Sequence, residues 1–169
     1  MSHPLTAGSE TTVADNTRHR RRPRMLLAAG VAIVALAVLT GCINLNASQT
    51  TALNAMNHDR NVNHLATLPV QAQAQAKAQA WANNLAAKGY IYHSNLPTGY
   101  SSGWCSLGEN VGRGGSVAQV ETAYMKSPEH RANILDGRWA GVGVGVAVSA
   151  NGTTFTVQEF YKGGGCTGS

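Results

Sequence analysis

Cysteine is scarce in this chain, which has only three among 169 residues, and no two of them are spaced as Cys-x-x-Cys. This spacing excludes a structural zinc site made of paired cysteines, because such sites take their thiolates from closely spaced pairs. No two histidines stand four residues apart either, so the sequence contains no His-x-x-x-His helix of the kind that binds zinc in metalloproteases.

Charged residues are also few, at 12% of the chain, and most of the basic excess lies near the N-terminus. Residues 1–41 hold five of the 13 basic residues and two of the eight acidic residues. The rest of the chain therefore has eight basic and six acidic residues, a net charge of +2. This balance provides no basic surface for a phosphate backbone, and we expect no nucleic-acid partner.

One long uncharged run, residues 25–40, follows the basic segment "RHRRRPR". A basic segment, an apolar stretch and small residues before a cleavage point predict a secretory signal peptide. The run is shorter than the roughly 20 residues that a transmembrane helix needs. An uncleaved membrane anchor and a buried core helix are the alternatives.

The run ends in "LTGC", residues 39–42, which resembles the bacterial lipobox. The resemblance implies that residues 1–41 are a lipoprotein signal peptide and that Cys42 is lipid-modified. Acyl chains on Cys42 would hold the protein on the outer, extracytoplasmic face of the cell membrane, because each buried methylene contributes about 0.8 kcal/mol. Residues 42–50 are then expected to form a short lipidated tether.

The other two cysteines, Cys105 and Cys166, remain as an even pair in an exported protein, where disulfides form readily. A bridge that closes a loop of about 60 residues would stabilise the fold by about 4 kcal/mol in the chain-entropy model. We expect this disulfide, and two unpaired thiols are the alternative.

Helical spacing of apolar residues predicts helices over residues 51–65 and 71–88. The second begins with alternating glutamine and alanine, which mimics a strand, but both residue types favour helices. Gly89 supplies the stop signal of this helix. Residues 90–115 are rich in glycine, serine and aromatic residues, and we expect a long loop.

Two further helices are predicted after this loop. Ser116 is a suitable cap for a helix over residues 117–126. A short helix then begins at Ser127 and Pro128, with the serine hydroxyl as its cap and proline in the first turn.

Alternation predicts two strands, residues 141–149 and 154–162, joined by a type I′ turn at Asn151-Gly152. The glycines of "GVGVGV" leave one face of the first strand bare, so that another segment can pack very close to it.

Five motifs occur in order along the chain: "WANNLAAKG", "HSN", "GENV", "YMKSPEHRANIL" and "GVGVGV" followed by "TVQEF". Together they resemble the bacterial branch of the CAP superfamily, the SCP-like extracellular proteins, over about residues 50–162. The resemblance implies an α+β domain over residues 51–169, an α-β-α sandwich with helices on both sides of a small antiparallel sheet. It also implies a cleft where two histidines and two acids meet and, in some members, bind a divalent metal.

Three of these four cleft residues are present by resemblance: His93 and His130 match the histidines, and Glu109 matches the acid of "GEN". The second acid is missing, since Ser127 stands at its position and Tyr124 replaces the preceding tryptophan of the family. Any divalent metal such as Zn²⁺ would therefore bind weakly to His93, Glu109 and His130. No other cofactor is expected.

The resulting hypothesis is a non-enzymatic cell-surface lipoprotein whose cleft binds a lipid, cell-wall or protein ligand. The alternative is a metal-dependent hydrolase that acts on cell-wall or protein substrates, for which no catalytic residue is identified. A serine hydrolase built on Ser127, His130 and Glu109 is disfavoured, because we expect the Ser127 hydroxyl to be occupied as a helix cap.

Overall fold

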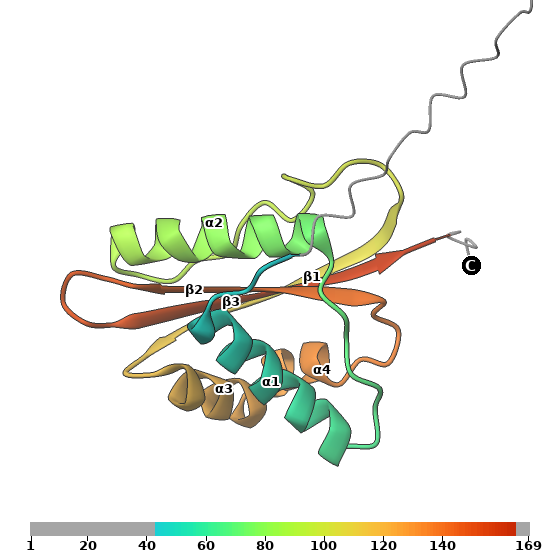
Figure 1. Cartoon of the computed structure of the whole chain (residues 1–169), viewed down its shortest axis with the longest axis horizontal. Coiled ribbons are helices and arrows are strands. Elements are labelled where there is room, and N and C mark those ends of the chain that lie inside the picture. Colours follow the sequence, from blue (N-terminus) through green and yellow to red (C-terminus); the bar gives the residue numbers. More distant parts are fainter. Residues whose placement is uncertain (1–42, 165–169) are drawn as a thin grey trace, which may run out of the picture. The chain divides into compact units, whose positions relative to one another are not determined.

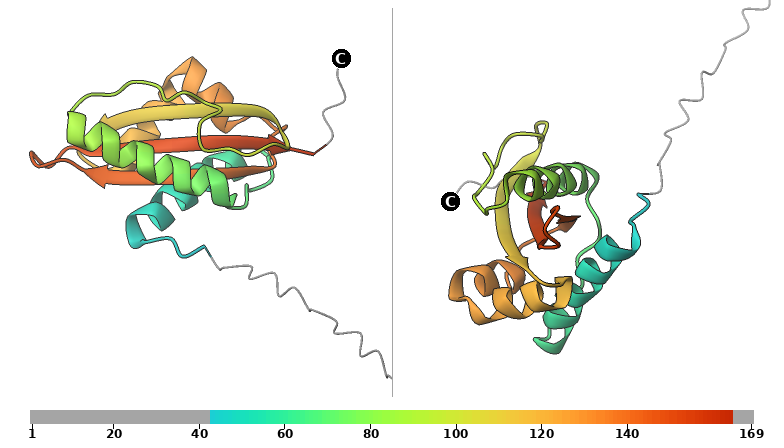
Figure 2. Two further views of the ribbon diagram at one scale, coloured as in Figure 1. Left: turned by 90° about the horizontal axis from the view of Figure 1, so that it is seen from above. Right: turned by 90° about the vertical axis from the view of Figure 1, so that its left-hand side faces the viewer.

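The computed structural model describes residues 43–164 and contains helices on both faces of a three-stranded sheet (Figure 1). The elements are α1 (Ala47–Val62), α2 (Ala72–Lys88), β1 (Trp104–Gly114), α3 (Val117–Lys126), α4 (Pro128–Ile134), β2 (Gly141–Val148) and β3 (Thr154–Gly163). The strand order is β1-β3-β2, with both pairings antiparallel. Helix α2 covers one face, and α1, α3 and α4 cover the other (Figure 2). The predicted α+β sandwich is confirmed.

The predicted signal peptide, Cys42 and Cys166 lie outside the described residues, and their predictions remain untested. The Sγ atom of Cys105 lies 2.6 Å from the carbonyl oxygen of Gly164, two residues before Cys166. The Cys105–Cys166 disulfide stays a prediction, which mass spectrometry of the non-reduced protein decides. Within residues 43–164, no helix is long and apolar enough to span a bilayer.

Helix α1 begins earlier than predicted, at Ala47, because Asn46 forms a capping box with Gln49. The Asn46 side chain accepts from the Gln49 backbone N–H at 2.9 Å, and the Gln49 side chain accepts from the Asn46 N–H at 2.8 Å. The predicted tether over residues 42–50 is therefore wrong for residues 47–50, which form the first turn of α1.

Strand β1 lies inside the segment that was predicted as a loop, residues 90–115, and corrects that prediction. It pairs with β3 along its length, from Trp104 opposite Gly163 to Gly114 opposite Thr154. Glycine and polar residues hide the alternation of this strand, so it is the pairing with β3 that defines it.

Helix α2 packs unusually close to β2, as the bare glycine face predicted. A Cβ atom at Gly143 would overlap the backbone of Ala74, and one at Gly145 would overlap the carbonyl of Ala78. Both alanines are fully buried. Only glycine therefore fits at these two strand positions without movement of the helix.

The glutamines of α2 satisfy the free edge of β2. Gln75 donates to the carbonyl of Val144 at 2.8 Å and accepts from its N–H at 2.9 Å. Gln79 makes the same pair of bonds with Val146, at 2.9 and 3.1 Å. The Gln-Ala alternation thus has a structural purpose, because alanine permits close packing while glutamine hydrogen-bonds to a strand edge that has no partner strand.

The hairpin between β2 and β3 forms as predicted, but its turn is not type I′. That turn needs a positive φ at both central residues. Here Gly152 has a φ of 84°, whereas His64 is the one non-glycine residue of the described chain with a positive φ. The Gly152 N–H donates to the Ser149 carbonyl at 2.9 Å and closes a wider loop.

Candidate functional site

His93 and Glu109 form a contact in which a buried carboxylate holds an exposed ring. Their Nδ1 and Oε1 atoms are 2.7 Å apart, and the same Oε1 accepts the Ser94 N–H at 2.9 Å. The Glu109 side chain is 1% exposed and the His93 side chain is 63% exposed. The structure therefore places these two predicted site residues together, with the imidazole presented to solvent.

His130, the third predicted site residue, is bonded elsewhere. Its Nδ1 lies 2.8 Å from the Ser127 hydroxyl, and its ring lies 5.0 Å from the ring of Tyr124. Burial lowers the pKa of His130, and the positive charge of His93 lowers it further. The two histidines thus interact through space, although His130 directs one nitrogen to Ser127.

The role predicted for Ser127 as a side-chain cap is wrong. Ser127 occupies the N-cap position of α4, but its side chain caps no backbone N–H. Its hydroxyl donates instead to Glu129 at 3.1 Å and contacts His130.

Glu159 is an acid of this region that sequence reasoning missed. It lies directly opposite Glu109 in the pairing of β1 with β3, so both carboxyls point to the α2 face of the sheet. Glu159 is 0% exposed. Burial raises the pKa of Glu159 to about 8, and the negative charge of Glu109 adds to the rise. A detectable signal existed, since alternation places Glu159 on the same strand face as Phe155 and Val157.

Lys77 of α2 is the cation nearest to this pair of acids. Its Nζ lies 3.3 Å from Glu159 Oε1, but it donates its hydrogen bonds to the carbonyls of Asn95 and Leu96, at 3.1 and 2.7 Å. Neither Glu159 oxygen makes a hydrogen bond of good geometry within the described residues, so its contact with Lys77 is an ion pair. The lysine opposes the rise in pKa without cancelling it.

A pocket of about 510 Å³ adjoins this region, between α2 and the loop that precedes β1. We call it the α2 pocket; its lining consists of Gln73, Ala76, Lys77, Ala80, Trp81, Ser94, Asn95, Thr98 and Gly99. Ser94 connects it to the His93–Glu109 pair, because the Ser94 N–H binds Glu109. The Ser94 hydroxyl is buried and has no hydrogen-bond partner among residues 43–164.

Comparison with known proteins identifies the family. A model of the CAP family, the cysteine-rich secretory protein family, matches residues 53–160. The chain belongs to the CAP family. Among curated protein sequences, none matches the chain significantly.

Solved structures share the CAP fold at low sequence identity. An outer surface protein of Borrelia burgdorferi is 17% identical, with a TM-score of 0.63 over 72% of this chain and 97% of the other. Venom allergen-like protein 4 of Schistosoma mansoni is 13% identical, with a TM-score of 0.60 over 72% of this chain and 92% of the other. At these sequence identities, the similarity shows a shared fold and nothing about function.

The donor set of this CAP domain does not fit a metal centre with three protein ligands. Within residues 43–164, no three His, Cys, Asp or Glu side chains are grouped so that they could hold a metal ion. His93 and Glu109 meet, but His130 bonds to Ser127, which stands where the family has its second acid. Weak binding of Zn²⁺ stays a prediction, and no chemical step is derived through a metal.

Residues 99–103 of this CAP domain, "GYSSG", match the Gly-x-Ser-x-Gly pattern, with Ser101 at its centre. In hydrolases this pattern carries the nucleophile on a sharp turn between a strand and a helix. Here the segment is an exposed loop that leads into β1, and Ser101 accepts a hydrogen bond from Gln73 at 2.7 Å. The pattern therefore lacks the required structural context.

Proposed function

We propose that this CAP domain is a non-enzymatic binding module, held on the outer face of the cell membrane by a lipid on Cys42. Its ligand is an amphipathic molecule of the lipid class, bound in the α2 pocket. The observation that carries this proposal is the pocket itself, which combines an apolar wall with a buried polar group beside the His93–Glu109 pair. Concave, mostly apolar pockets with a few convergent polar groups are the usual sites for small ligands.

The pocket lining combines apolar and polar groups that suit an amphipathic ligand. Ala76, Ala80 and the Trp81 ring provide apolar contacts along α2. The Ser94 hydroxyl lacks a hydrogen-bond partner among the described residues, and a ligand oxygen that reaches it would satisfy this group. An acyl chain would lie along the alanines while its head group reaches Ser94.

The lipid anchor is supported by the "LTGC" motif and by the short connection to the fold. Only residues 43–46 separate Cys42 from the first residue of α1, Ala47. Lipidation at Cys42 would therefore keep the domain close to the membrane. The likeness in fold to an outer surface protein agrees with this location.

Ligand binding is tested by titrating lauric acid into the purified protein and following tryptophan fluorescence, because Trp81 lines the pocket. Ala80→Phe fills the pocket from an exposed position of α2 and should weaken binding at least tenfold. The matched control is Ala87→Phe, which adds the same ring at an exposed α2 position outside the pocket lining. Equal binding by both variants would refute the pocket as the site.

The anchor is tested separately with Cys42→Ala in the expressing bacterium. We expect loss of the lipid-modified form and an unprocessed leader. Wild-type processing and membrane association of this variant would contradict lipidation at Cys42. Neither outcome depends on ligand binding in the α2 pocket.

A further inference from the structure

The outer edge of β1 is a strand edge without a partner strand. The order β1-β3-β2 makes β1 and β2 the two edge strands of the sheet. The edge of β2 is covered by Gln75 and Gln79 of α2 and by a bridge to Val70. Within residues 43–164, β1 pairs with β3 alone. Such an edge presents a row of backbone N–H and C=O groups to whatever lies beside it.

The register of the sheet shows which residues of β1 direct their backbone groups outward. Val144 of β2 bonds to a glutamine of α2 through both its N–H and its carbonyl, so its backbone faces away from β3. Because the pairs of an antiparallel ladder alternate, Gln158, opposite Val144, directs its own groups toward Asn110 of β1. The next residues in this alternation, Val111 and Arg113, therefore face outward.

These outward groups lack partners over the last part of β1. No hydrogen bond from the described residues reaches the backbone N–H or carbonyl of Val111 or Arg113 on this side. The loop before β1 contacts the edge through a side chain only, since Arg113 Nη1 donates to the Gly89 carbonyl at 2.9 Å. The Glu109 carbonyl accepts from Asn133 at 3.4 Å, which limits the free edge on the other side. Unpaired backbone groups at a residue as buried as Val111, 4% exposed, are costly.

A groove of about 210 Å³ opens along this free edge. Its lining comes from three parts of the chain: Ile91 of the loop, Val111 and Arg113 of β1, and Ala123 and His130 of the helices α3 and α4. We call it the β1 groove, defined by these five residues. It shares no lining residue with the α2 pocket, so the two sites are independent.

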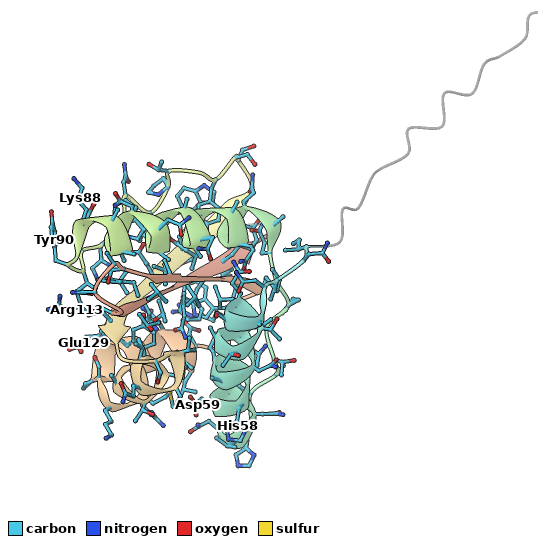
Figure 3. All side chains as sticks on the ribbon, turned by 60° about the vertical axis from the view of Figure 1, so that its left-hand side comes forward. His58, Asp59, Lys88, Tyr90, Arg113 and Glu129 are labelled. Atoms are coloured by element: carbon cyan, nitrogen blue, oxygen red, sulfur yellow. The ribbon has the colours of Figure 1, made fainter. Side chains whose placement is uncertain are left out.

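The position of the groove favours a single extended chain as its occupant. Figure 3 shows Arg113 between Tyr90 of the loop and Glu129 of α4, so the edge lies between these two segments. Two copies of the domain would bring loop and helix together before their β1 edges could pair. One strand needs only about 4.8 Å beside the edge. The volume is below the roughly 300 Å³ at which pockets for drug-sized ligands begin.

We propose that the β1 groove binds an extended peptide, which adds to the sheet as a fourth strand antiparallel to β1. The peptide backbone exchanges hydrogen bonds with the outward N–H and C=O groups of Val111 and Arg113, the mode of recognition known as strand addition. Peptide residues opposite these two place their side chains on the loop side. Tyr90 and Ile91 lie there, 54% and 43% exposed, and favour apolar side chains.

The peptide residue between these two apolar residues lies opposite Gly112, and its side chain points to the helix side of the groove. Ala123 and His130 line that side. The Nδ1 atom of His130 is bonded to Ser127, so Nε2 is the ring nitrogen that a small hydroxyl side chain can reach. The peptide that fits best therefore alternates apolar residues with small polar ones.

The test is calorimetric titration of the blocked peptide acetyl-Ser-Val-Ser-Val-Ser-amide into the purified protein, and we expect one-to-one binding. The matched probe carries a methyl group on the backbone nitrogen of each valine. It keeps the side chains but loses the two donors to β1, so it should bind about tenfold more weakly or worse. Equal binding of the two peptides would overturn the proposal.

Arg113 offers a matched pair of variants, because its side chain is exposed and its N–H faces the groove. Arg113→Pro removes this N–H at an edge position where proline is tolerated, and it should weaken peptide binding about tenfold. Arg113→Ala removes the same side chain but keeps the N–H, and it should leave the affinity unchanged. Equal affinity of the two variants would contradict backbone pairing at this residue.

Two further measurements protect the test against a folding defect. Ala123→Phe fills the groove from an exposed position of α3 and should abolish binding, whereas Ala118→Phe, at an exposed α3 position outside the groove, should not. By NMR, peptide should slow hydrogen exchange at the amides of Val111 and Arg113 and leave that of Gly112, already paired with β3, unchanged. Absence of peptide binding, or self-association that slows the same two amides without peptide, would overturn the proposal.

Discussion

Each face of the sheet buries one carboxyl whose pKa is raised to about 8, Glu159 on the α2 face and Glu121 on the α3 face. Glu159 is fully enclosed, beside a second carboxyl, and lies 3.3 Å from the ammonium of Lys77. Glu121 lines a groove, where its carboxyl contacts the neutral amide of Gln158 and hydrogen-bonds to the carboxyl of Asp59. The same direction of pKa shift thus arises in two settings. In one, a lysine ammonium lies close to the carboxyl, and in the other the carboxyl of Asp59 accepts its proton.

The two faces of β2 differ in packing, and this difference predicts the largest effect. Gly143→Ala adds one carbon against the backbone of Ala74 and should lower the free energy of unfolding by about 3 kcal/mol or more. Val144→Ala removes two carbons from the opposite face and should cost only about 2 kcal/mol, because neighbouring side chains can partly close the cavity. Urea denaturation measures both.

Val148→Ala is the control for this pair, since Val148 is 62% exposed and the change should stay within about 0.5 kcal/mol. If Gly143→Ala lowered the free energy of unfolding as little as Val148→Ala, α2 could not pack against β2 as closely as described.

The two buried carboxyls predict a pH dependence of stability with a definite sign. Both pKa values rise from 4.5 to about 8 on folding, so the folded state holds protons that the unfolded state has released. The free energy of unfolding should fall by a few kcal/mol as pH rises from about 4.5 to about 8, and then level off. Denaturation at a series of pH values measures this slope.

Glutamine substitutions separate the two faces. Glu121→Gln and Glu159→Gln should each remove part of the slope, and the double variant should remove nearly all of it. The lowered pKa of His130 acts in the opposite direction near pH 6, so the comparison is made between wild type and variants. An unchanged slope in the double variant would show that neither carboxyl holds its proton on folding.

The smallest expected effect concerns the candidate site. By NMR titration, His130 should have a pKa below 6.5, chiefly because of burial. His93→Gln removes a nearby positive charge and should raise the pKa of His130. The control is His58→Gln, which changes an exposed histidine of α1 that has no part in the pKa shift of His130. A pKa of His130 that does not respond to His93→Gln would place the two rings too far apart to share a site.

The sequence predicted the elements whose own residues define them. The spacing and the Gly89 stop predicted α2, and alternation predicted the β2–β3 hairpin. Strand β1 was missed, because its glycines and polar residues carry no period and only pairing with β3 orders it. The His93–Glu109 contact was anticipated through the family motifs, and no local pattern would have revealed it.

The two buried acids were missed for the same reason as β1. Glu159 and Glu121 stand on faces whose partners come from distant parts of the chain, Glu109 for one and Asp59 with Gln158 for the other. The sequence shows an acid on an inward face, but not the strand register or helix packing that supplies its neighbours. Ser127 was misjudged because capping preference is a local rule, and here the nearby His130 ring competes for the hydroxyl.

This CAP domain has a His93–Glu109 pair and a separate His130 in place of a complete metal site. Calorimetric titration of Zn²⁺ at pH 7.5 into wild type and His130→Ala tests it most directly. We expect only weak binding, which falls as pH drops through about 6.5, because protonated histidines cannot bind metal. Tight one-to-one binding that is lost in both His93→Ala and His130→Ala would contradict the account and favour a metal-dependent hydrolase.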